Sequence, residues 1–176
     1  LALLAAAGAA EKRVLFLGNS YTYHRDVPAL VEAMARTLGH ELTCLAEAAP
    51  DAALEDHWNK RTRQRLAATP RWDVLVLQQG PSTAPENRRH LLKWVGRWAA
   101  LGRKHGVQPA VFMVWPFAGQ AARSGFSHVS ESYRAAALAA GAPVYPVGEA
   151  WALALHEEPR LRLYEDDGLH STREGA

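Results

Sequence analysis

Five short apolar segments, separated by segments with helical periodicity, constrain the fold of this chain more than any other feature. The apolar segments lie at residues 14–17, 42–46, 74–77, 111–115 and 143–147. Runs of this length are typical of strands buried on both faces of a parallel sheet. Helices are expected between them, near residues 28–38, 52–68, 85–101, 128–140 and 148–156. This alternation predicts a three-layer α/β/α sandwich around a five-stranded parallel sheet.

Length and composition indicate one domain and exclude some partners. The chain has 176 residues, of which 48% are hydrophobic and 22% charged, as is ordinary for a globular protein. We expect one domain over residues 11–176. A net charge of +2 is too small to indicate a nucleic-acid partner, and the basic run of Arg61, Arg63 and Arg65 is interpreted as a solvated helix face. The sequence does not indicate an oligomeric state.

The first ten residues, LALLAAAGAA, differ in composition from the rest of the chain. Their small apolar residues and the A-x-A-like end resemble the remnant of a secretory signal peptide. The segment is too short to span a membrane. We therefore expect a secreted or periplasmic protein with no membrane segment in its mature form.

The first predicted strand ends in Gly18-Asn19-Ser20, and the third ends in Gln78-Gln79. Open parallel sheets bind their ligands beyond the carboxyl ends of the strands, so these polar residues are expected to lie at one edge. Gly18 is interpreted as the residue that lets the chain turn tightly before the Ser20 hydroxyl.

A serine needs a base before it can act as a nucleophile. Asp167-Gly168-Leu169-His170, near the end of the chain, supplies an imidazole and a carboxylate within one loop. A carboxylate three residues before a histidine can accept a hydrogen bond from one ring nitrogen and leave the other to face the serine.

Four stretches, LFLGNSYT, LEDHWNK, VLVLQQGPS and DGLHSTREG, together resemble the SGNH, or GDSL-like, hydrolases. The resemblance covers residues 13–176. It implies a flavodoxin-like fold and esterase or acetylesterase activity, with Ser20 as nucleophile, His170 as general base and Asp167 as the residue that orients it. Asn19 stands where the family usually has an aspartate. Asp166 is a neighbouring alternative to Asp167 that lacks the family spacing to His170.

The resemblance also implies an oxyanion hole, to which Ser20 would contribute its own backbone N–H. The family's second block usually offers a glycine N–H, but this chain has Pro50-Asp51-Ala52. Proline has no N–H, which leaves the backbone of Asp51 as the expected donor. The third donor is a side-chain amide from Gln78 or Gln79. These side chains point to opposite faces of a strand, and the sequence does not choose between them.

Aromatic residues near the predicted strand and loop ends are candidates for contact with substrate: Tyr21, Trp58 and Trp115. Trp94 and Trp98 have helical core spacing, and His57 is interpreted as a surface or half-buried residue. The histidines are scattered and no metal-binding motif is present, so we expect neither a metal nor an organic cofactor.

The sequence therefore predicts a serine-dependent ester hydrolase that removes acetyl or other small acyl groups from carbohydrate or small-molecule esters through an acyl-enzyme. Two alternatives stay open: an acyltransferase with the same triad, and a non-catalytic carbohydrate-binding module on this fold. The final stretch HSTREGA resembles the cap and first residues of a last helix. We expect that helix to pack on the sheet, and the sequence to lack the rest of it.

Overall fold

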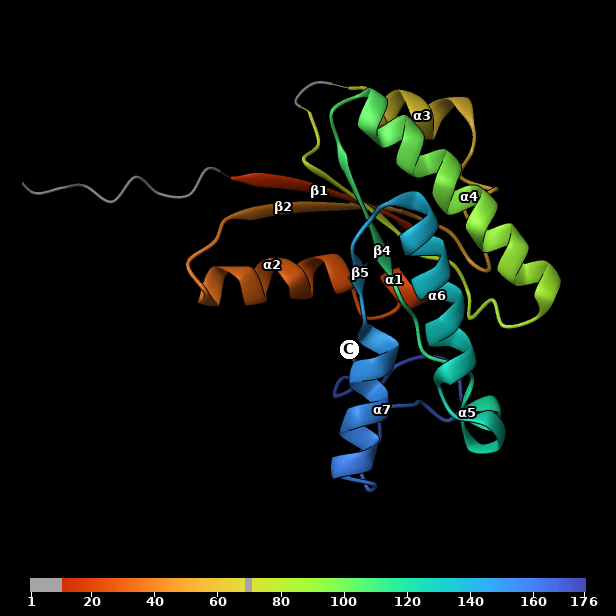
Figure 1. Ribbon diagram of the computed structural model, residues 1–176. Coiled ribbons are helices and arrows are strands. Elements are labelled where there is room, and N and C mark those ends of the chain that lie inside the picture. The colour runs from red at the N-terminus through yellow and green to blue at the C-terminus, as the bar shows by residue number, and fades with distance from the viewer. Residues whose placement is uncertain (1–10, 69–70) are drawn as a thin grey trace, which may run out of the picture.

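A five-stranded sheet forms the centre of the molecule in the computed structural model, which describes residues 11–68 and 71–176 (Figure 1). All neighbouring strands pair in parallel, in the order β2-β1-β3-β4-β5. The strands are β1 (Lys12–Gly18), β2 (Leu42–Ala48), β3 (Val74–Leu77), β4 (Gln108–Phe112) and β5 (Val144–Tyr145). The predicted α/β fold with five parallel strands is confirmed.

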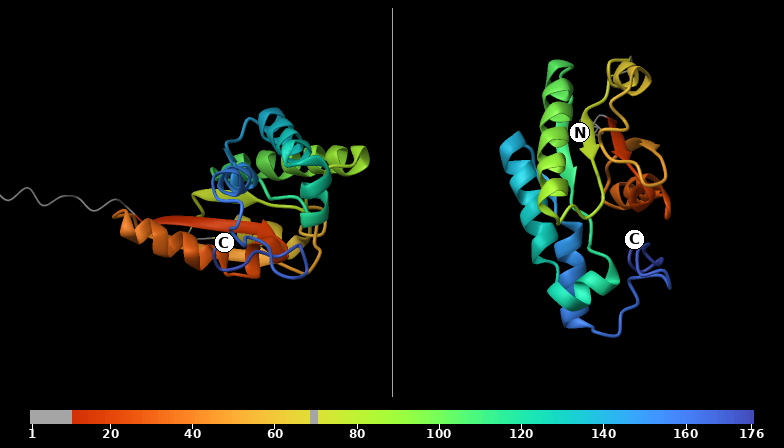
Figure 2. Two further views of the ribbon diagram at one scale, coloured as in Figure 1. Left: turned by 90° about the horizontal axis from the view of Figure 1, so that it is seen from below. Right: turned by 90° about the vertical axis from the view of Figure 1, so that its right-hand side faces the viewer.

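Seven helices connect or follow these strands in the described residues. They are α1 (Ser20–Tyr23), α2 (Val27–Thr37), α3 (Lys60–Leu66), α4 (Pro85–Lys104), α5 (Ala118–Ser124), α6 (Ser127–Ala140) and α7 (Val147–Glu157). Figure 2 shows α4 and α6 on one side of the sheet and α2 on the other. The sheet therefore lies between two helical layers.

The observed elements differ from the predicted ones in three main places. The strand expected at 111–115 lies earlier in the chain, as β4. The helix expected at 52–68 is only α3, because the chain forms turns before Asn59, whose side chain caps the helix by accepting from the Thr62 N–H at 3.0 Å. Helix α5 was not predicted, and it buries none of its residues. A short helix without a buried face leaves no apolar periodicity in the sequence.

The face of the sheet under α4 and α6 is completely buried. Leu15, Leu17, Leu75, Leu77 and Val111 alternate along three strands, and each has 0% exposure. Alternation places every second side chain of a strand on the same face. The matched registers of β1, β3 and β4 bring these side chains together as the main core.

The opposite face is less completely covered. Val14, Phe16, Val76 and Phe112 line an apolar groove of about 390 Å³ to which α2 contributes Val31 and α7 contributes Val147. The sequence also predicts that a last helix packs on the sheet. That helix stays a prediction.

Helix α2 forms where the sequence predicts a helix, but its apolar residues are largely exposed. Leu30, Met34 and Leu38 recur at helical spacing, yet they are 38%, 66% and 74% exposed. The helix buries only Val27 and Pro28 at its first turn. A spacing of four residues identifies an apolar stripe but not the partner that covers it.

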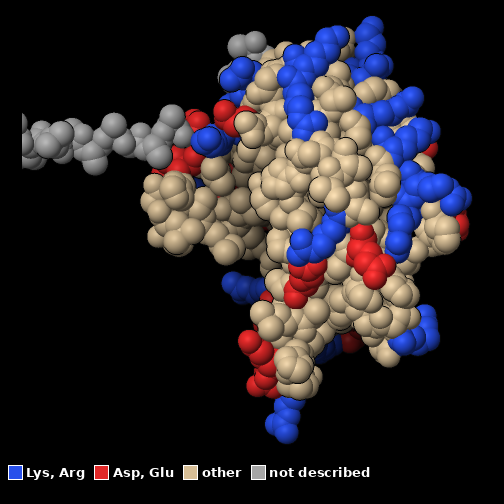
Figure 3. Space-filling view, in the orientation of Figure 1, with Lys and Arg blue, Asp and Glu red and all other residues tan. Residues whose placement is uncertain are grey.

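Lysine and arginine side chains are spread over the side of the molecule formed by α4, with acidic side chains more frequent below them (Figure 3). Arg61 and Arg63 are exposed, as expected for a solvated face of α3. Within the described residues, no helix is both long and apolar enough to cross a bilayer. The leader predicted at residues 1–10 lies outside the described part of the chain.

Candidate active site

Strand β1 leads directly into the short helix α1 through a turn that we define as residues 18–22. Asn19 caps α1, and its Oδ1 accepts a hydrogen bond from the Tyr21 N–H at 3.2 Å. The Asn19 Nδ2 donates to the carbonyl of Ala52 at 3.1 Å. Asn19 is buried, so both ends of its amide are satisfied by protein. This cap places Ser20 at the first position of α1.

Gln78, at the end of β3, holds this turn with every polar atom of its side chain. Its Oε1 accepts from the Asn19 N–H and from the Thr22 hydroxyl, each at 2.8 Å. Its Nε2 donates to the Asn19 Oδ1 and to the Gln79 carbonyl, each at 2.9 Å. An amide nitrogen has two hydrogens, and both are used here. Gln78 is 1% exposed and supports the turn from within the core.

Gly18 is required by this close contact with Gln78. A Cβ on Gly18 would lie 2.3 Å from the Gln78 Oε1 and 2.4 Å from the Thr22 Oγ1. A tight turn was the expected reason for a glycine at this position. Because the φ of Gly18 lies outside the left-handed region, the lack of space for a Cβ explains the glycine instead. The Gly18 carbonyl is 2.8 Å from the Nε2 of His57, which is buried, whereas the sequence had suggested a surface or half-buried residue.

The side chain of Gln79 has the same amide as Gln78 but bonds to other partners, outside the turn. Its Oε1 accepts from the Leu54 N–H at 3.1 Å, and its Nε2 donates to the Ser82 hydroxyl at 3.1 Å. The second N–H of the amide has no acceptor within the described residues. The Tyr133 hydroxyl, from α6, donates to the Gln79 carbonyl and fixes the backbone at this point.

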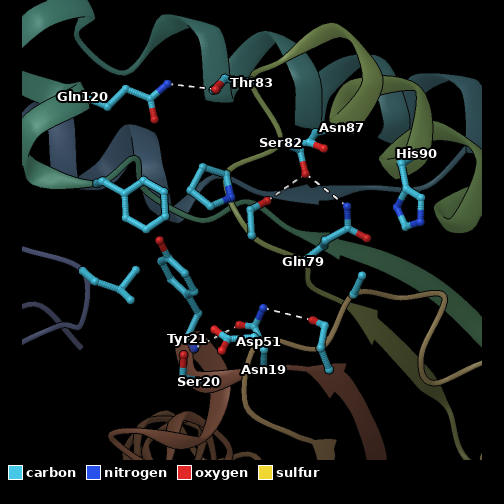
Figure 4. A pocket seen from close by; sticks show the side chains of 16 residues that line it. Asn19, Ser20, Tyr21, Asp51, Gln79, Ser82, Thr83, Asn87, His90 and Gln120 are labelled. Carbon is cyan, nitrogen blue, oxygen red and sulfur yellow. Dashed lines mark hydrogen bonds between the residues drawn. The ribbon is translucent and has the colours of Figure 1, made fainter.

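A cavity of about 410 Å³ opens at this edge of the sheet (Figure 4). Four of the predicted site residues line it: Ser20, Tyr21, Asp51 and Gln79. Gln78 does not. Most of the other lining residues are polar or small, and the large apolar ones are Phe117 and Leu169. Besides these two, the lining includes Ala52, Ala53, Gly80, Pro81, Ser82, Thr83, Asn87, His90 and Gln120.

Tyr21 and Asp51 both offer polar groups at this cavity. The Tyr21 hydroxyl is buried and has no hydrogen-bond partner in the described chain, and burial raises its pKa. Asp51 has a φ of 53°, in the left-handed region. Glycine adopts this region without steric cost, and aspartate is among the few other residues that tolerate it. The backbone N–H of Asp51 has no acceptor in residues 11–68 and 71–176.

The two tryptophans predicted to contact substrate do not line the cavity. Trp115 is 2% exposed and stacks on Trp151 at 4.0 Å between ring centroids, while its Nε1 donates to the Leu169 carbonyl at 2.9 Å. Trp58 packs against Trp94 and Trp98. Both are therefore packing residues, and Trp115 also supports the loop that contains His170.

The loop of residues 165–171 brings Asp167 and His170 together. The Asp167 Oδ2 lies 2.6 Å from the His170 Nδ1, and its Oδ1 accepts from the N–H groups of Leu169 and His170 at 2.8 and 2.9 Å. The His170 imidazole, followed by these two N–H groups, lowers the pKa of Asp167 to about 2. Asp166 instead pairs with Arg162. Asp167 is therefore the carboxylate that orients the imidazole.

The other nitrogen of that imidazole is buried without a partner. The His170 Nε2 has no hydrogen bond within the described residues, to the Ser20 hydroxyl or to any other group. A buried polar atom without a partner is costly and calls for an explanation. The ring of His24, which directly follows α1, stacks on the His170 ring with centroids 4.3 Å apart. The loop that contains His170 therefore lies against the end of α1.

Three residues of this region were missed or misread in the sequence. His24 and Tyr133 carried no local signal, because each makes its contact with a distant segment. His57 was noted, but its burial depends on the packing of the turns before α3. Among the described residues, no group of three His, Cys, Asp or Glu side chains could hold a metal ion.

Comparison with known proteins identifies the fold. No family model and no curated protein sequence matches this chain. A solved structure of a candidate SGNH hydrolase from Slackia heliotrinireducens is similar, with a TM-score of 0.74 and 24% identity over 94% of this chain and 92% of that one. The lipase/acylhydrolase from Enterococcus faecalis aligns with a TM-score of 0.67 and 15% identity, over 93% and 89% of the two chains.

A member of the lipolytic G-D-S-L family from Veillonella parvula aligns with a TM-score of 0.66 and 13% identity, over 94% of this chain and 92% of that one. These identities are low, whereas the alignments span nearly complete chains. The chain therefore has the fold of the SGNH and GDSL-like hydrolases, which confirms the predicted resemblance at the level of fold.

Proposed function

We propose that this protein is a serine-dependent carboxylic ester hydrolase with Ser20 as nucleophile, His170 as base and Asp167 as the residue that orients the base. The observation that supports it most is the buried, unpartnered Nε2 of His170, on an imidazole that Asp167 already holds by its other nitrogen. Such a nitrogen is available to accept a proton. Ser20 lines the cavity, as does Leu169, the residue before His170.

In the proposed reaction, the Ser20 Oγ attacks the acyl carbonyl while the His170 Nε2 accepts the hydroxyl proton. The histidine then donates this proton to the departing alcohol, and an acyl-enzyme forms on Ser20. Water, deprotonated by the same nitrogen, attacks the acyl-enzyme. The bond from the acyl carbon to the Ser20 Oγ then breaks, the histidine returns the proton to that oxygen, and the acid is released. Asp167 keeps its negative charge throughout and stabilises the imidazolium, in agreement with its low pKa.

Three N–H groups are proposed to stabilise the negative oxygen that develops on the carbonyl. They are the backbone N–H groups of Ser20 and Asp51 and the second amide N–H of Gln79. The choice of Gln79 rests on hydrogen-bond capacity: both hydrogens of the Gln78 amide are used within the scaffold, whereas one of Gln79 is unused. One such donor contributes on the order of 10²–10³ in rate.

The residues that line the cavity suit an ester with a polar alcohol and a small acyl group. Thr83, Asn87 and Gln120 offer hydroxyl and amide groups that match the hydroxyls of a sugar. Ala52, Ala53 and Gly80 are small lining residues beside Gln79, and they suit an acetyl or similarly short chain. We therefore propose acylated carbohydrates or comparable small esters as the substrate class.

An ester panel tests this proposal. Aryl acetate, aryl esters with longer acyl chains and acetylated xylose oligomers are incubated with the wild-type protein and with Ser20→Ala. We expect acetyl esters to be hydrolysed fastest, and Ser20→Ala to lose at least about 10⁴-fold in kcat. Hydrolysis by Ser20→Ala at the wild-type rate, or no hydrolysis of any ester by folded wild type, would contradict the proposal.

The same panel, repeated with an added sugar as the acyl acceptor, separates hydrolysis from acyl transfer. Transfer uses the same acyl-enzyme but replaces water by the alcohol, so it yields a new ester and less free acid. We expect free acid as the main product.

A further inference from the structure

The nucleophile and its base come from opposite ends of the chain, so something must hold one relative to the other. Asp167 cannot do so, because it belongs to the same short loop as His170 and fixes only the orientation of the ring within that loop. Direct contacts between this loop and the residues next to Ser20 can do so. Two consecutive residues after α1, His24 and Arg25, provide such contacts.

His24 contacts the loop through both its ring face and its Nε2. The ring stacks on the His170 ring with 4.3 Å between centroids and 26° between planes. The Nε2 lies 3.1 Å from the Glu165 Oε2. One histidine therefore contacts the base itself and the residue at the start of its loop.

Arg25 contacts both ends of the same loop. Its Nη2 pairs with the Glu165 Oε1, and its Nε donates to the Ser171 carbonyl at 3.1 Å. The hydrogen bond from His24, with the charge of Arg25 added, lowers the pKa of the Glu165 carboxyl. His24 and Arg25 together contact the loop before, at and after His170.

These two residues have a fixed relation to Ser20. The His24 N–H donates to the Ser20 carbonyl at 2.9 Å, closing the single turn of α1. The start of that turn is held by Asn19 and Gln78 inside the core. A shift of the Ser20 backbone would therefore carry His24 and Arg25 with it.

We propose that His24 and Arg25 are positioning residues, which dock the loop of residues 165–171 onto α1 and thereby set the place of His170 relative to Ser20. This rests on the proposed function, in which His170 is the base for Ser20. The contacts are partly exposed, and exposed ion pairs contribute little to stability. Small misplacements of a catalytic group, in contrast, cost up to about 10²-fold in rate.

The loop is also tied to the segment after β4, which is the competing account of its position. The Ala118 N–H donates to the Gly168 carbonyl at 2.8 Å, and the Tyr164 hydroxyl donates to the Pro116 carbonyl at 2.8 Å. If these contacts alone determine the position of the loop, the contacts of His24 and Arg25 with it have no effect on catalysis. Removing both side chains then leaves kcat unchanged.

Kinetics of His24→Ala, Arg25→Gln and the double variant separate these accounts, with aryl acetate as substrate. We expect kcat of the double variant to fall by about 10–100-fold while KM changes by less than about threefold, because neither side chain lines the cavity. His24→Phe keeps a flat ring against His170, and we expect it to recover most of the loss of His24→Ala. Arg134→Gln, which breaks another exposed pair with Glu149, is the matched control.

Hydrogen exchange of the backbone amides of residues 165–171 provides a measurement that does not depend on activity. We expect at least about threefold faster exchange in the double variant and unchanged exchange in Arg134→Gln. Faster loop exchange in a protein whose wild type hydrolyses no ester would sustain the docking role and end the proposed function. Unchanged kcat and unchanged exchange in the double variant, with an active wild type, would overturn the docking role alone.

Discussion

The two halves of the candidate site are built very differently. The turn that presents Ser20 is largely buried, and its polar groups are satisfied by hydrogen bonds with the side chains of Asn19, Gln78 and His57. The loop that presents His170 lies near the surface and depends on ion pairs, one ring stack and a few backbone contacts. The first half is part of the core, whereas the second is attached to it.

This difference separates two kinds of mutational effect. Substitutions in the buried turn remove partners from groups that water cannot reach, so they reduce stability. Substitutions in the loop expose little new surface, so they reduce activity while the fold remains intact. Four variants test this separation.

The largest effect is expected from His170→Ala. Removing the base should lower kcat/KM by on the order of 10⁴–10⁶, because Ser20 then has no acceptor for its proton. The melting temperature should change by less than about 2 °C, since the lost ring lies on a partly exposed loop. Steady-state kinetics and calorimetry measure the two quantities. His156→Ala, at the exposed end of α7, is the control; a large loss of stability in His170→Ala alone would break the comparison.

Gln79→Glu should have the next largest effect. The substitution keeps the shape and the acceptor for the Leu54 N–H but replaces the whole NH2 group by an oxygen, which removes both the unused N–H and the N–H that donates to Ser82. We expect kcat to fall by about 10²–10³ with a smaller change in KM, because the donor acts on charge that develops in the transition state. Gln64→Glu adds the same charge at an exposed position of α3 and should leave kcat unchanged. Equal kinetics for the two variants would remove Gln79 from the proposed oxyanion hole.

Gln78→Leu should act on stability instead. It leaves the Asn19 N–H and the Thr22 hydroxyl without a buried partner and removes one of the two side-chain donors to the Gln79 carbonyl. We expect a loss of about 2–5 kcal/mol and a melting temperature lower by about 5–15 °C. Calorimetry of Gln78→Leu beside Gln64→Leu measures this. A stable Gln78→Leu protein with a lost kcat would show that Gln78, and not Gln79, is the oxyanion donor.

The smallest effect concerns acid stability. The pKa of Asp167 in the folded protein is about 2, below its ordinary value of 3.8. Its contribution is therefore complete above pH 4 and is lost as the pH falls toward 2. The carboxylate is exposed, so we expect only a few degrees of difference between the melting temperatures of wild type and Asp167→Asn. A difference that shrinks steadily as the pH falls from about 4 to 2, in melting curves between pH 2 and 6, is the expected result.

The parts of this structure that the sequence could predict are those with local signals. The apolar run at 74–77 matches β3, and the helix predicted near 28–38 matches α2. The D-x-x-H spacing correctly brought Asp167 and His170 together, because three residues of one loop fix that geometry.

The rest depends on which distant segments meet. Gln78 and Gln79 are neighbours with the same chemistry, and only the position of Asn19 makes one of them a scaffold residue. Trp115 was expected at the rim because it follows a strand, yet Trp151 of α7 covers it. Neither contact leaves a periodicity or a motif that a reader of the sequence could recognise.

Covalent labelling tests the central claim, that Ser20 and His170 act together, most directly. The wild-type protein and His170→Ala are treated with a fluorophosphonate, and the rate and position of the adduct are followed by mass spectrometry. We expect a single adduct on Ser20 in the wild type and a rate at least about 10³-fold lower in His170→Ala. An adduct at another residue, no adduct on folded wild type, or equal rates in both proteins would contradict the account.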